Sequence, residues 1–339
     1  MICVWTVYLA LAATGAPAVP VDTRALIRTP NNGRPVIVAP GAAFSALLDE
    51  EARLRLVRGE TAVALSVSWA DAAGGGHQAR CPIPDNAPPG DYAIEAATPD
   101  GLHRNIRSVF VREQFPNAYN FAHVTDVHIG GNDRPSPKET FRAVIQAVNA
   151  SDAEFVLVTG DLTEHAAVDE FNDFTEVLNI CEKPTFVCGG ERDRTGTLYE
   201  DLFGPEVYAF RFGEDGYLGF DAKAPAGMSA LDTQDGDLER LRRKLKPCRW
   251  TIGFTHRYGD SLREPHLGMR TQLVLFVDNP LDLLVFGHWE RENTEEVRRV
   301  PWNTTRLVAT PAARDRAYRI IDVTPKGVVP RPPEYATTK

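Results

Sequence analysis

Residues that can bind metal ions follow five short apolar runs in this sequence, each time just after the run ends. The five clusters contain Asp126 with His128, then Asp161, then Glu191, then His256, and finally His288 with Glu290. Carboxylate oxygens and imidazole nitrogens are ligands that suit Mn, Fe, Zn and similar divalent ions. Two such ions, about 3.5–4 Å apart, can hold a phosphate group and lower the pKa of a bridging water. The residue types therefore predict a two-metal hydrolytic site.

The elements that must position these clusters are strands of an α/β domain. From Asn117 onward, apolar runs alternate with helical patterns, which is typical of a layered α/β fold. The runs read as buried strands at 121–124, 155–159, 185–188, 251–255 and 283–286. Because sites in open α/β sheets form at the strand ends, we expect the five clusters to converge. We expect Gly160 and Gly287 to let the backbone turn sharply, so that the next side chain points inward.

Three helices are predicted between these strands. Ser136 is expected to cap the first, with Pro137 at its first position and Glu139 closing a capping box. Apolar residues at helical spacing predict two further helices near 168–178 and 238–245.

The region before residue 116 has a different pattern. Short alternating runs between 21 and 113, separated by turn signals such as Pro88-Pro89-Gly90, predict a small β-sandwich, immunoglobulin-like in type. It holds no catalytic constellation, so a structural or adhesion role is the default expectation. We expect the chain to divide into a signal peptide at 1–18, a β-sandwich at 19–115, an α/β domain at 116–325 and an extended tail at 326–339.

The first 18 residues are apolar and end in Ala16-Pro17-Ala18, a pattern that a signal peptidase can cut. No Lys or Arg precedes Arg24, so the usual basic start of a signal is missing. A misplaced start codon and a membrane-retained stub are therefore the alternatives. No other segment approaches the ~20 apolar residues of a membrane-spanning helix. We expect a secreted or periplasmic protein.

The net charge of −9 argues against a protein that binds nucleic acid without regard to sequence, because such binding needs a cationic surface. The expected partner is a phosphate-ester substrate, and the oligomeric state is left open.

In their order along the chain, the clusters resemble the calcineurin-like metallophosphoesterase superfamily, which includes purple acid phosphatases and many bacterial phosphodiesterases. The family pattern is D-x-H, G-D, G-N-H-D/E, H and G-H-x-H, and the resemblance covers residues 117–323. It implies a four-layer α/β/β/α sandwich. It also implies that Asp126, His128 and Asp161 hold one ion, and that Asp161 bridges to a second ion held by His256 and His288.

Three positions depart from the family pattern. Glu191 stands where the family has a ligating Asn, Arg192 where it has the His assigned to leaving-group protonation, and Glu290 where it has a ligating His. Both glutamates can still donate oxygen, so we expect them to be ligands. Their added negative charge favours harder ions than Zn. We expect two divalent ions, with Mn or Fe favoured and Mg or Zn as alternatives.

Arg192 is the most consequential departure, because arginine stays protonated and cannot act as a general acid. It can clamp a phosphate oxygen, or it can pair with Glu191 or Asp193 and close the site. Losing an acid typically costs 10²–10⁴ in rate, so esters with good leaving groups, and hence phosphodiesters, are favoured.

The expected mechanism is in-line attack on phosphorus by a metal-bridging hydroxide, with the catalytic roles at Asp161, Arg192, Asp193 and His288. The alternative from another class is a pseudoenzyme, which keeps the fold as a binding or scaffolding module. A single-metal or Ca-binding module without hydrolytic activity is a third interpretation.

Overall fold

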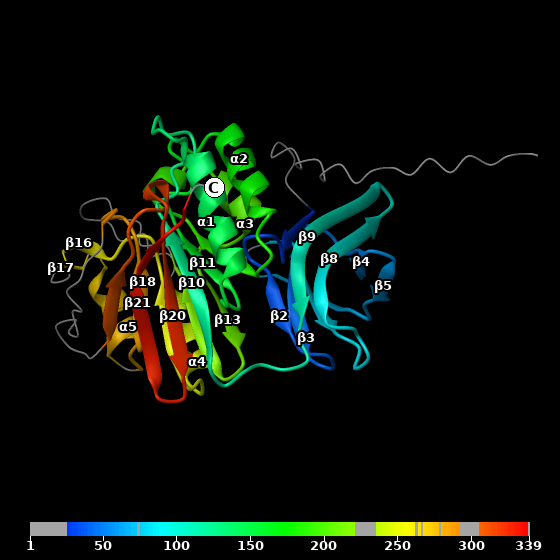
Figure 1. Cartoon of the computed structure of the whole chain (residues 1–339). Coiled ribbons are helices and arrows are strands. Elements are labelled where there is room, and N and C mark those ends of the chain that lie inside the picture. The colour runs from blue at the N-terminus through cyan, green and yellow to red at the C-terminus, as the bar shows by residue number, and fades with distance from the viewer. Residues whose placement is uncertain are drawn as a thin grey trace, which may run out of the picture.

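The computed structural model of the protein describes residues 26–72, 75–220, 235–261, 264–265, 267–277, 279–291 and 305–337. The expected signal peptide at 1–18 lies outside these residues. Figure 1 shows an all-β part, built from the first third of the chain, beside a larger α/β part. Among the described helices, none has the length and apolar character needed to cross a membrane.

The all-β part contains two sheets, as expected for a β-sandwich. One has the order β1 (Ile27–Thr29), β3 (Ala43–Leu48), β7 (His77–Pro82), β6 (Ser68–Asp71). The other has the order β2 (Val36–Val38), β9 (Gly101–Val111), β8 (Gly90–Thr98), β4 (Arg53–Arg58), β5 (Thr61–Ala64). Alternation along β4 explains the packing, since Leu54 and Leu56 are buried in the core while Arg53 and Arg55 face outward.

The α/β part contains two five-stranded sheets and one small hairpin. The first sheet has the order β12 (Thr185–Cys188), β11 (Val156–Thr159), β10 (Tyr119–Thr125), β20 (Ala317–Thr324), β21 (Gly327–Tyr335). The second has the order β13 (Tyr208–Phe212), β14 (Asp215–Gly219), β15 (Thr251–Phe254), β18 (Leu283–Phe286), β19 (Arg306–Ala309). The hairpin pairs β16 (Gly259–Ser261) with β17 (Glu264–Pro265). Strands β10, β11 and β12 run parallel, as do β14, β15, β18 and β19.

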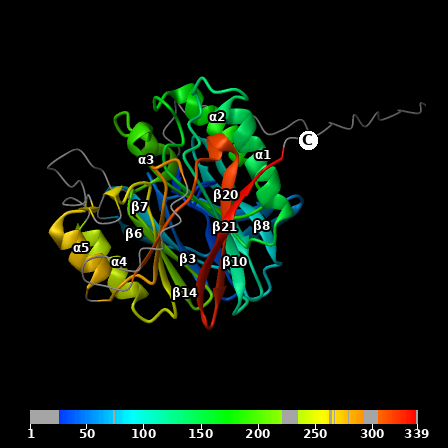
Figure 2. The same cartoon turned by 60° about the vertical axis from the view of Figure 1, so that its left-hand side comes forward.

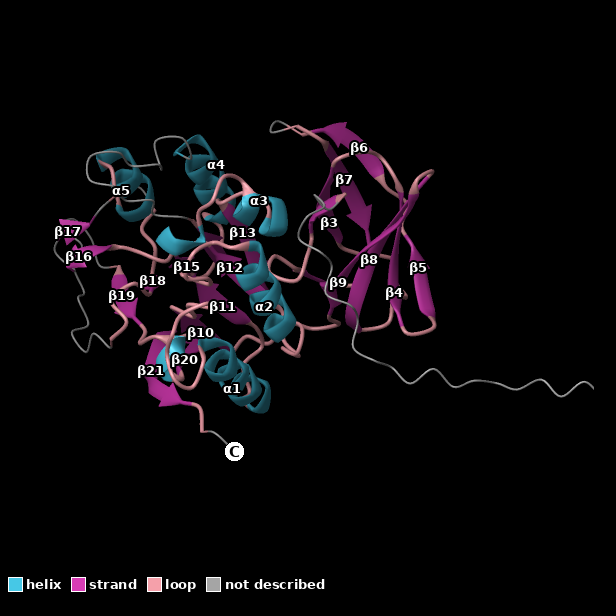
Figure 3. Cartoon of the chain, turned by 90° about the horizontal axis from the view of Figure 1, so that it is seen from above, coloured by secondary structure: helices cyan, strands magenta, loops and turns pink. Residues whose placement is uncertain are grey.

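The described helices are α1 (Pro137–Ala150), α2 (Val168–Leu178), α3 (Leu198–Phe203), α4 (Asp235–Leu245) and α5 (Met269–Phe276), with short 3₁₀ turns η1 (Glu191–Asp193) and η3 (Ala313–Asp315). The predicted helices are confirmed, and α1 begins with the expected capping box. Seen from above, the strands of the α/β part lie between α1 and α2 on one side and α4 and α5 on the other (Figure 3).

Apolar clusters show how these layers are joined. Side chains of α1 and α2, such as Phe141 and Phe174, pack on the first sheet, while Leu238 of α4 and Leu275 of α5 pack on the second. A third cluster, rich in aromatic rings, fills the space between the two sheets. Figure 2 shows the same succession of helices, two sheets and helices. The expected four-layer α/β/β/α sandwich is confirmed.

The C-terminal segment differs from the expected extended tail at 326–339. Over Gly327–Tyr335 the chain is strand β21, which pairs antiparallel with β20 and so belongs to the first sheet. Proline is tolerated in a strand that is hydrogen-bonded along one side only, and β21 is an edge strand. The prolines therefore did not exclude a strand here.

The all-β part docks on the other edge of the first sheet. The backbone N–H of Val187 in β12 donates to the carbonyl oxygen of Gly33 at 2.7 Å, and the Asn31 side chain donates to the carbonyl oxygen of Leu202 at 3.2 Å. The guanidinium carbon of Arg34 lies 4.0 Å from the centre of the Tyr208 ring. The expected boundary at 115/116 falls in the connection between β9 and β10.

Candidate metal centre

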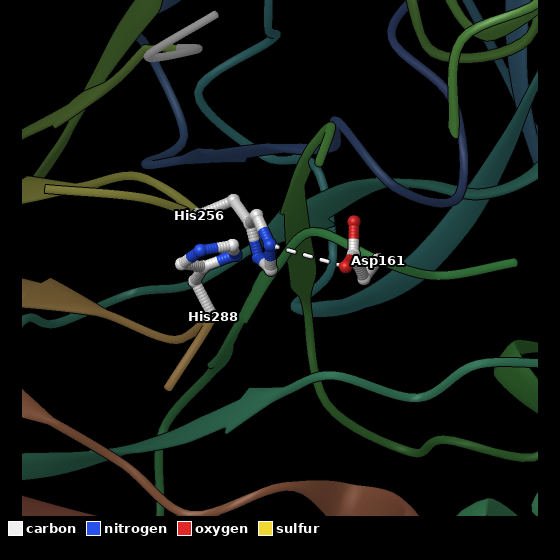
Figure 4. Close-up of side chains that lie close together, drawn as sticks. All are labelled: Asp161, His256 and His288. Carbon is white, nitrogen blue, oxygen red and sulfur yellow. Dashed lines mark ion pairs between the residues drawn. The ribbon is translucent and has the colours of Figure 1, made fainter. Parts of the chain in front are cut away.

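Strand ends from both sheets meet at one place, as expected from the parallel strands. Asp126 and His128 follow β10, Asp161 follows β11, His256 follows β15, and His288 follows β18. The structure brings them together in two groups whose ligand atoms all lie within 4.8 Å of one another. One group contains Asp126, His128 and Asp161, and the other contains Asp161, His256 and His288. Figure 4 shows the second group, in which Asp161 and His256 form an ion pair.

His256 is oriented with one ring nitrogen toward this centre. Its Nδ1 lies 3.0 Å from the carbonyl oxygen of Thr159, which accepts a hydrogen bond and so places the proton on Nδ1. Its Nε2 lies 3.3 Å from an oxygen of Asp161 and makes no hydrogen bond within the described part of the chain. A buried nitrogen without a hydrogen bond, beside a carboxylate, fits a metal ligand.

His128 has the same arrangement on the other side. Its Nδ1 lies 2.7 Å from Glu164. Its Nε2 makes no hydrogen bond to any described residue, and it lies 3.9 Å from oxygens of both Asp126 and Asp161 and 3.4 Å from Glu290. Three carboxylates around one nitrogen repel each other unless a cation lies among them. The donor set therefore fits divalent ions.

The electrostatics of the centre show strong coupling between its charges. Burial opposes protonation of His256, but the nearby Asp161 and Asp126 carboxylates outweigh it and raise the pKa of His256 to about 10. Burial opposes ionisation of Asp161, yet the charge on His256 holds the pKa of Asp161 well below its usual range. Burial raises the pKa of Asp126 to about 6, assisted by Asp161 and opposed by His256. Closely packed groups of opposite charge are typical of functional sites.

Backbone strain is concentrated at the same residues. A positive φ is uncommon outside glycine and costs of order 1–3 kcal/mol for each residue. The candidate site residues with positive φ are Asp126 (53°), His128 (56°), Asp161 (45°), His288 (67°) and Glu290 (53°). Among the described non-glycine residues only three others have it, and none of these is a candidate ligand. Strain held at five site residues is a second, independent mark of function.

The two glycines expected to form sharp turns act differently. Gly160 has a φ of +66°, as a sharp turn before Asp161 requires. Gly287 has no positive φ, and the need for glycine at this position comes from close packing instead. A Cβ atom there would lie 1.8 Å from Oγ1 of Thr125 and 2.4 Å from Oδ2 of Asp126.

Asp193 is not part of either ligand group. Its buried carboxylate accepts hydrogen bonds from the backbone N–H groups of Gly190, Leu162 and Thr163, and from the Thr163 hydroxyl. These bonds tie η1 to the loop that follows β11. The structure therefore gives Asp193 a role in holding the loops rather than a contact with the centre.

The two carboxylate oxygens of Glu191 contact different partners, and the same is true of Glu290. One oxygen of Glu191 forms an ion pair with Arg257, and the other lies 3.8 Å from Nδ1 of His288. One oxygen of Glu290 pairs with Arg314, and the other faces His128. Neither glutamate is in the two ligand groups. Each lies at the border of the centre, with one oxygen turned toward a candidate ligand.

Arg192 pairs with neither of its expected partners. Its Nη1 atom lies 2.5 Å from Oε1 of Glu164, the residue that also contacts His128. Consecutive residues in a helical turn point in different directions, which explains why Glu191 and Asp193 do not reach it.

Three charged residues at the centre were missed from the sequence: Glu164, Arg257 and Arg314. Two had a signal, because Glu164 lies three residues after Asp161 in the same loop and Arg257 directly follows His256. Arg314 had none, since it lies outside every motif of the family pattern.

No curated protein matches the chain. Among solved structures, the chain is similar to purple acid phosphatase PPD1 from yellow lupin (Lupinus luteus), with 13% identity, a TM-score of 0.49 and coverage of 83% of this chain and 67% of that one. It is also similar to the protein TT1561 of Thermus thermophilus, with 15% identity, a TM-score of 0.45 and coverage of 63% and 98%.

The family of the chain is shown by its sequence. The pattern that defines the calcineurin-like phosphoesterases matches residues 119–290, which is more than half of the 339 residues and includes every candidate ligand. The chain belongs to the calcineurin-like phosphoesterase family.

Proposed function

We propose that this protein hydrolyses phosphate esters with two divalent metal ions and prefers phosphodiesters. The observation that carries the proposal is Asp161, which is shared by two groups of candidate ligands. A carboxylate shared in this way is what two closely spaced ions need. We also propose a secreted or periplasmic location, for which the apolar segment at 1–18 is the support.

The candidate ligands are assigned to two ion positions. Asp126 and His128 would hold one ion, His256 and His288 would hold the other, and Asp161 is placed to serve both. Burial, assisted by the charge of His256 in the metal-free protein, lowers the pKa of His288, which favours a neutral ring with a lone pair for an ion. Binding of an ion would release the extra proton of His256. When bound, two divalent ions attract the phosphate and lower the pKa of a water molecule, so that it can attack as hydroxide near neutral pH. Mn or Fe is the favoured identity.

Arg192 contributes charge and no proton. Its side chain is about half exposed, and Glu164 engages one of its N–H groups. The guanidinium has five such donors, so others remain to hold a phosphate oxygen. Because Arg192 cannot protonate the leaving group, esters with a good leaving group react best. The phosphodiester preference is a separate part of the proposal, and it is tested below with two esters that share one leaving group.

The proposal is tested by hydrolysis of bis-p-nitrophenyl phosphate and p-nitrophenyl phosphate with added Mn²⁺. We expect faster turnover of the diester, loss of activity with a chelator, and a decrease of about 10³-fold or more in Asp161→Asn, since the charge that the ions supply contributes several kcal/mol. The matched control is Asp169→Asn, an exposed carboxylate in the first turn of α2, which should keep wild-type activity. Equal rates for wild type and Asp161→Asn would contradict the proposal.

A second candidate, a scaffolding module that has lost catalysis, is favoured by one observation. All three residues that depart from the family pattern, Glu191, Arg192 and Glu290, form ion pairs with charged side chains. Elemental analysis of protein equilibrated with excess Mn²⁺ distinguishes the two. About two ions per chain supports the hydrolase, one ion indicates a half-site, and no ion favours the scaffold.

A further inference from the structure

His128 lies between carboxylates on both sides of its ring. Glu164 is 2.7 Å from Nδ1, while Asp126, Asp161 and Glu290 surround Nε2. The side chain of His128 is almost completely buried. A carboxylate at Nδ1 keeps the proton on that nitrogen and leaves the lone pair of Nε2 directed at the other three. Glu164 is therefore placed to determine which ring nitrogen of His128 can bind an ion.

The backbone fixes Glu164 at this position. The loops that follow β10 and β11 run side by side, with the N–H of His128 donating to the carbonyl oxygen of Asp161 at 2.9 Å. Ile129 and Thr163 form an isolated parallel bridge, and the N–H of Glu164 donates to the carbonyl oxygen of Ile129 at 2.8 Å. Because both loops are joined at successive residues, the backbone of Glu164 is held in register with that of His128.

Arg192 holds the second oxygen of Glu164. Its Nη1 atom is 2.5 Å from Oε1, so the two carboxylate oxygens serve different partners, Arg192 and His128. Arg192 is itself anchored, since its backbone N–H donates to Oδ1 of Asp161 at 3.0 Å. Because the backbone of Arg192 is held in this way, the contact with its guanidinium restricts the rotamers of the Glu164 carboxylate.

We infer that Glu164 and Arg192 are positioning residues, which together hold His128 in the orientation and tautomer that bind an ion. The inference rests on the proposed metal centre and assigns Arg192 a task other than proton transfer. Partners of this kind that hold a metal-binding histidine typically contribute 10- to 100-fold to metal affinity.

The test is Mn²⁺ binding to metal-depleted protein by calorimetry. We expect Glu164→Ala to weaken one binding step, that of the ion at His128, by about 10- to 100-fold, and Glu164→Gln to weaken it less because the amide oxygen can still accept the Nδ1 proton. Arg192→Ala should weaken it about 3- to 5-fold, because this ion pair is partly exposed, and Arg192→Lys should restore most of the loss. Circular dichroism checks that each variant is folded.

A matched control is the ion pair between Arg142 of α1 and Glu176 of α2, 2.8 Å apart on the surface. Arg142→Ala and Glu176→Ala should leave Mn²⁺ affinity unchanged. A spectroscopic readout separates positioning from general destabilisation. In Co²⁺-loaded protein, the exchangeable Nδ1 proton of His128 should give a shifted NMR signal that is present in the wild type and lost in Glu164→Ala.

The outcomes separate this inference from the proposed function. Wild-type affinity in Glu164→Ala, with hydrolysis intact, would overturn the inference alone. Weakened affinity in Glu164→Ala, together with a wild type that binds Mn²⁺ but hydrolyses nothing, would support the inference and reject the hydrolase. A wild type that binds no ion would overturn both.

Discussion

The two halves of the metal centre are built differently, although both lie at strand ends. The half on the first sheet, with Asp126 and His128, sits on two loops joined by successive backbone hydrogen bonds, and both side chains are about 1% exposed. In the half on the second sheet, His288 is 25% exposed. A fully buried, preorganised set of ligands loses less freedom on binding than a set with one partly exposed member. We therefore expect the two proposed ion positions to be unequal, with the tighter one on the first sheet.

The largest expected change in Mn²⁺ affinity comes from removing one histidine from each half of the centre. We expect His128→Ala to weaken the tighter Mn²⁺ step by more than about 100-fold, beyond the usual loss for an outer partner. His288→Ala should leave that step intact and remove the weaker one. Calorimetric titration of both variants measures this. Equal losses in the two variants would mean that the halves are equivalent.

A second effect concerns the protonation of His123, which lies beneath the first half. Its ring nitrogens contact the hydroxyls of Thr310 and Thr159 at 2.7 and 2.8 Å. Burial, assisted by the charge of Arg319, lowers the pKa of His123 to about 3. Between pH 6.5 and 3 the unfolded chain therefore binds a proton that the folded protein does not. The stability from neutral His123 is complete above pH 6.5 and is lost as the pH falls, at roughly 1.4 kcal/mol per pH unit.

Urea unfolding at pH 6.5 and pH 4.5 in the presence of chelator measures this loss. We expect the free energy of unfolding of the wild type to decrease by roughly 2–3 kcal/mol more than that of His123→Asn over this range. Parallel pH profiles for the two proteins would show that His123 is not responsible.

A smaller change in Mn²⁺ affinity is expected from the two glutamates at the border of the centre. Glu290 faces His128 of the first half, whereas Glu191 faces His288 of the second. If each glutamate assists the ion on its own side, Glu290→Gln should weaken the tighter step, and Glu191→Gln the weaker one, by about 10-fold. Unchanged binding in both would show that the glutamates serve only their arginine partners.

The smallest effect tests whether support from α1 reaches the centre. Ser136→Ala removes the cap of α1, where the hydroxyl accepts from the Glu139 N–H. We expect the free energy of unfolding to fall by about 1 kcal/mol, with Mn²⁺ affinity unchanged. Thermal melting and calorimetry on the same sample measure both quantities. Weaker binding in this variant would place α1 among the elements that shape the site.

The sequence predicted the strand ends of the centre because their signals are local. A run such as 185–188 is short, apolar and followed by glycines, so both the strand and the turn after it are recorded in neighbouring residues. Convergence then followed from parallel pairing, which brings the carboxyl ends of strands to one edge. This reasoning selected Asp126, Asp161 and His256 as candidate ligands.

The pairing of side chains around the ligands could not be read in the same way. Which carboxylate Arg192 contacts depends on how the loops after β10, β11 and β12 lie in space, and no spacing along the chain records this. The contact between Glu290 and Arg314 also joins separate segments. Strand β21 was missed for a related reason, since prolines in its sequence indicate an extended chain but not the neighbour that it pairs with.

The docking of the all-β part has a consequence for how the chain behaves when it is cut. Of the two edges of the first sheet, β21 carries prolines, which discourage a further strand from adding to it. The other edge, β12, is met by Gly33, to which Val187 donates its backbone N–H. A chain that starts at residue 116 lacks this cover and offers β12 to other copies. Such a fragment is expected to self-associate through that strand, and we expect the full chain to be the more soluble of the two.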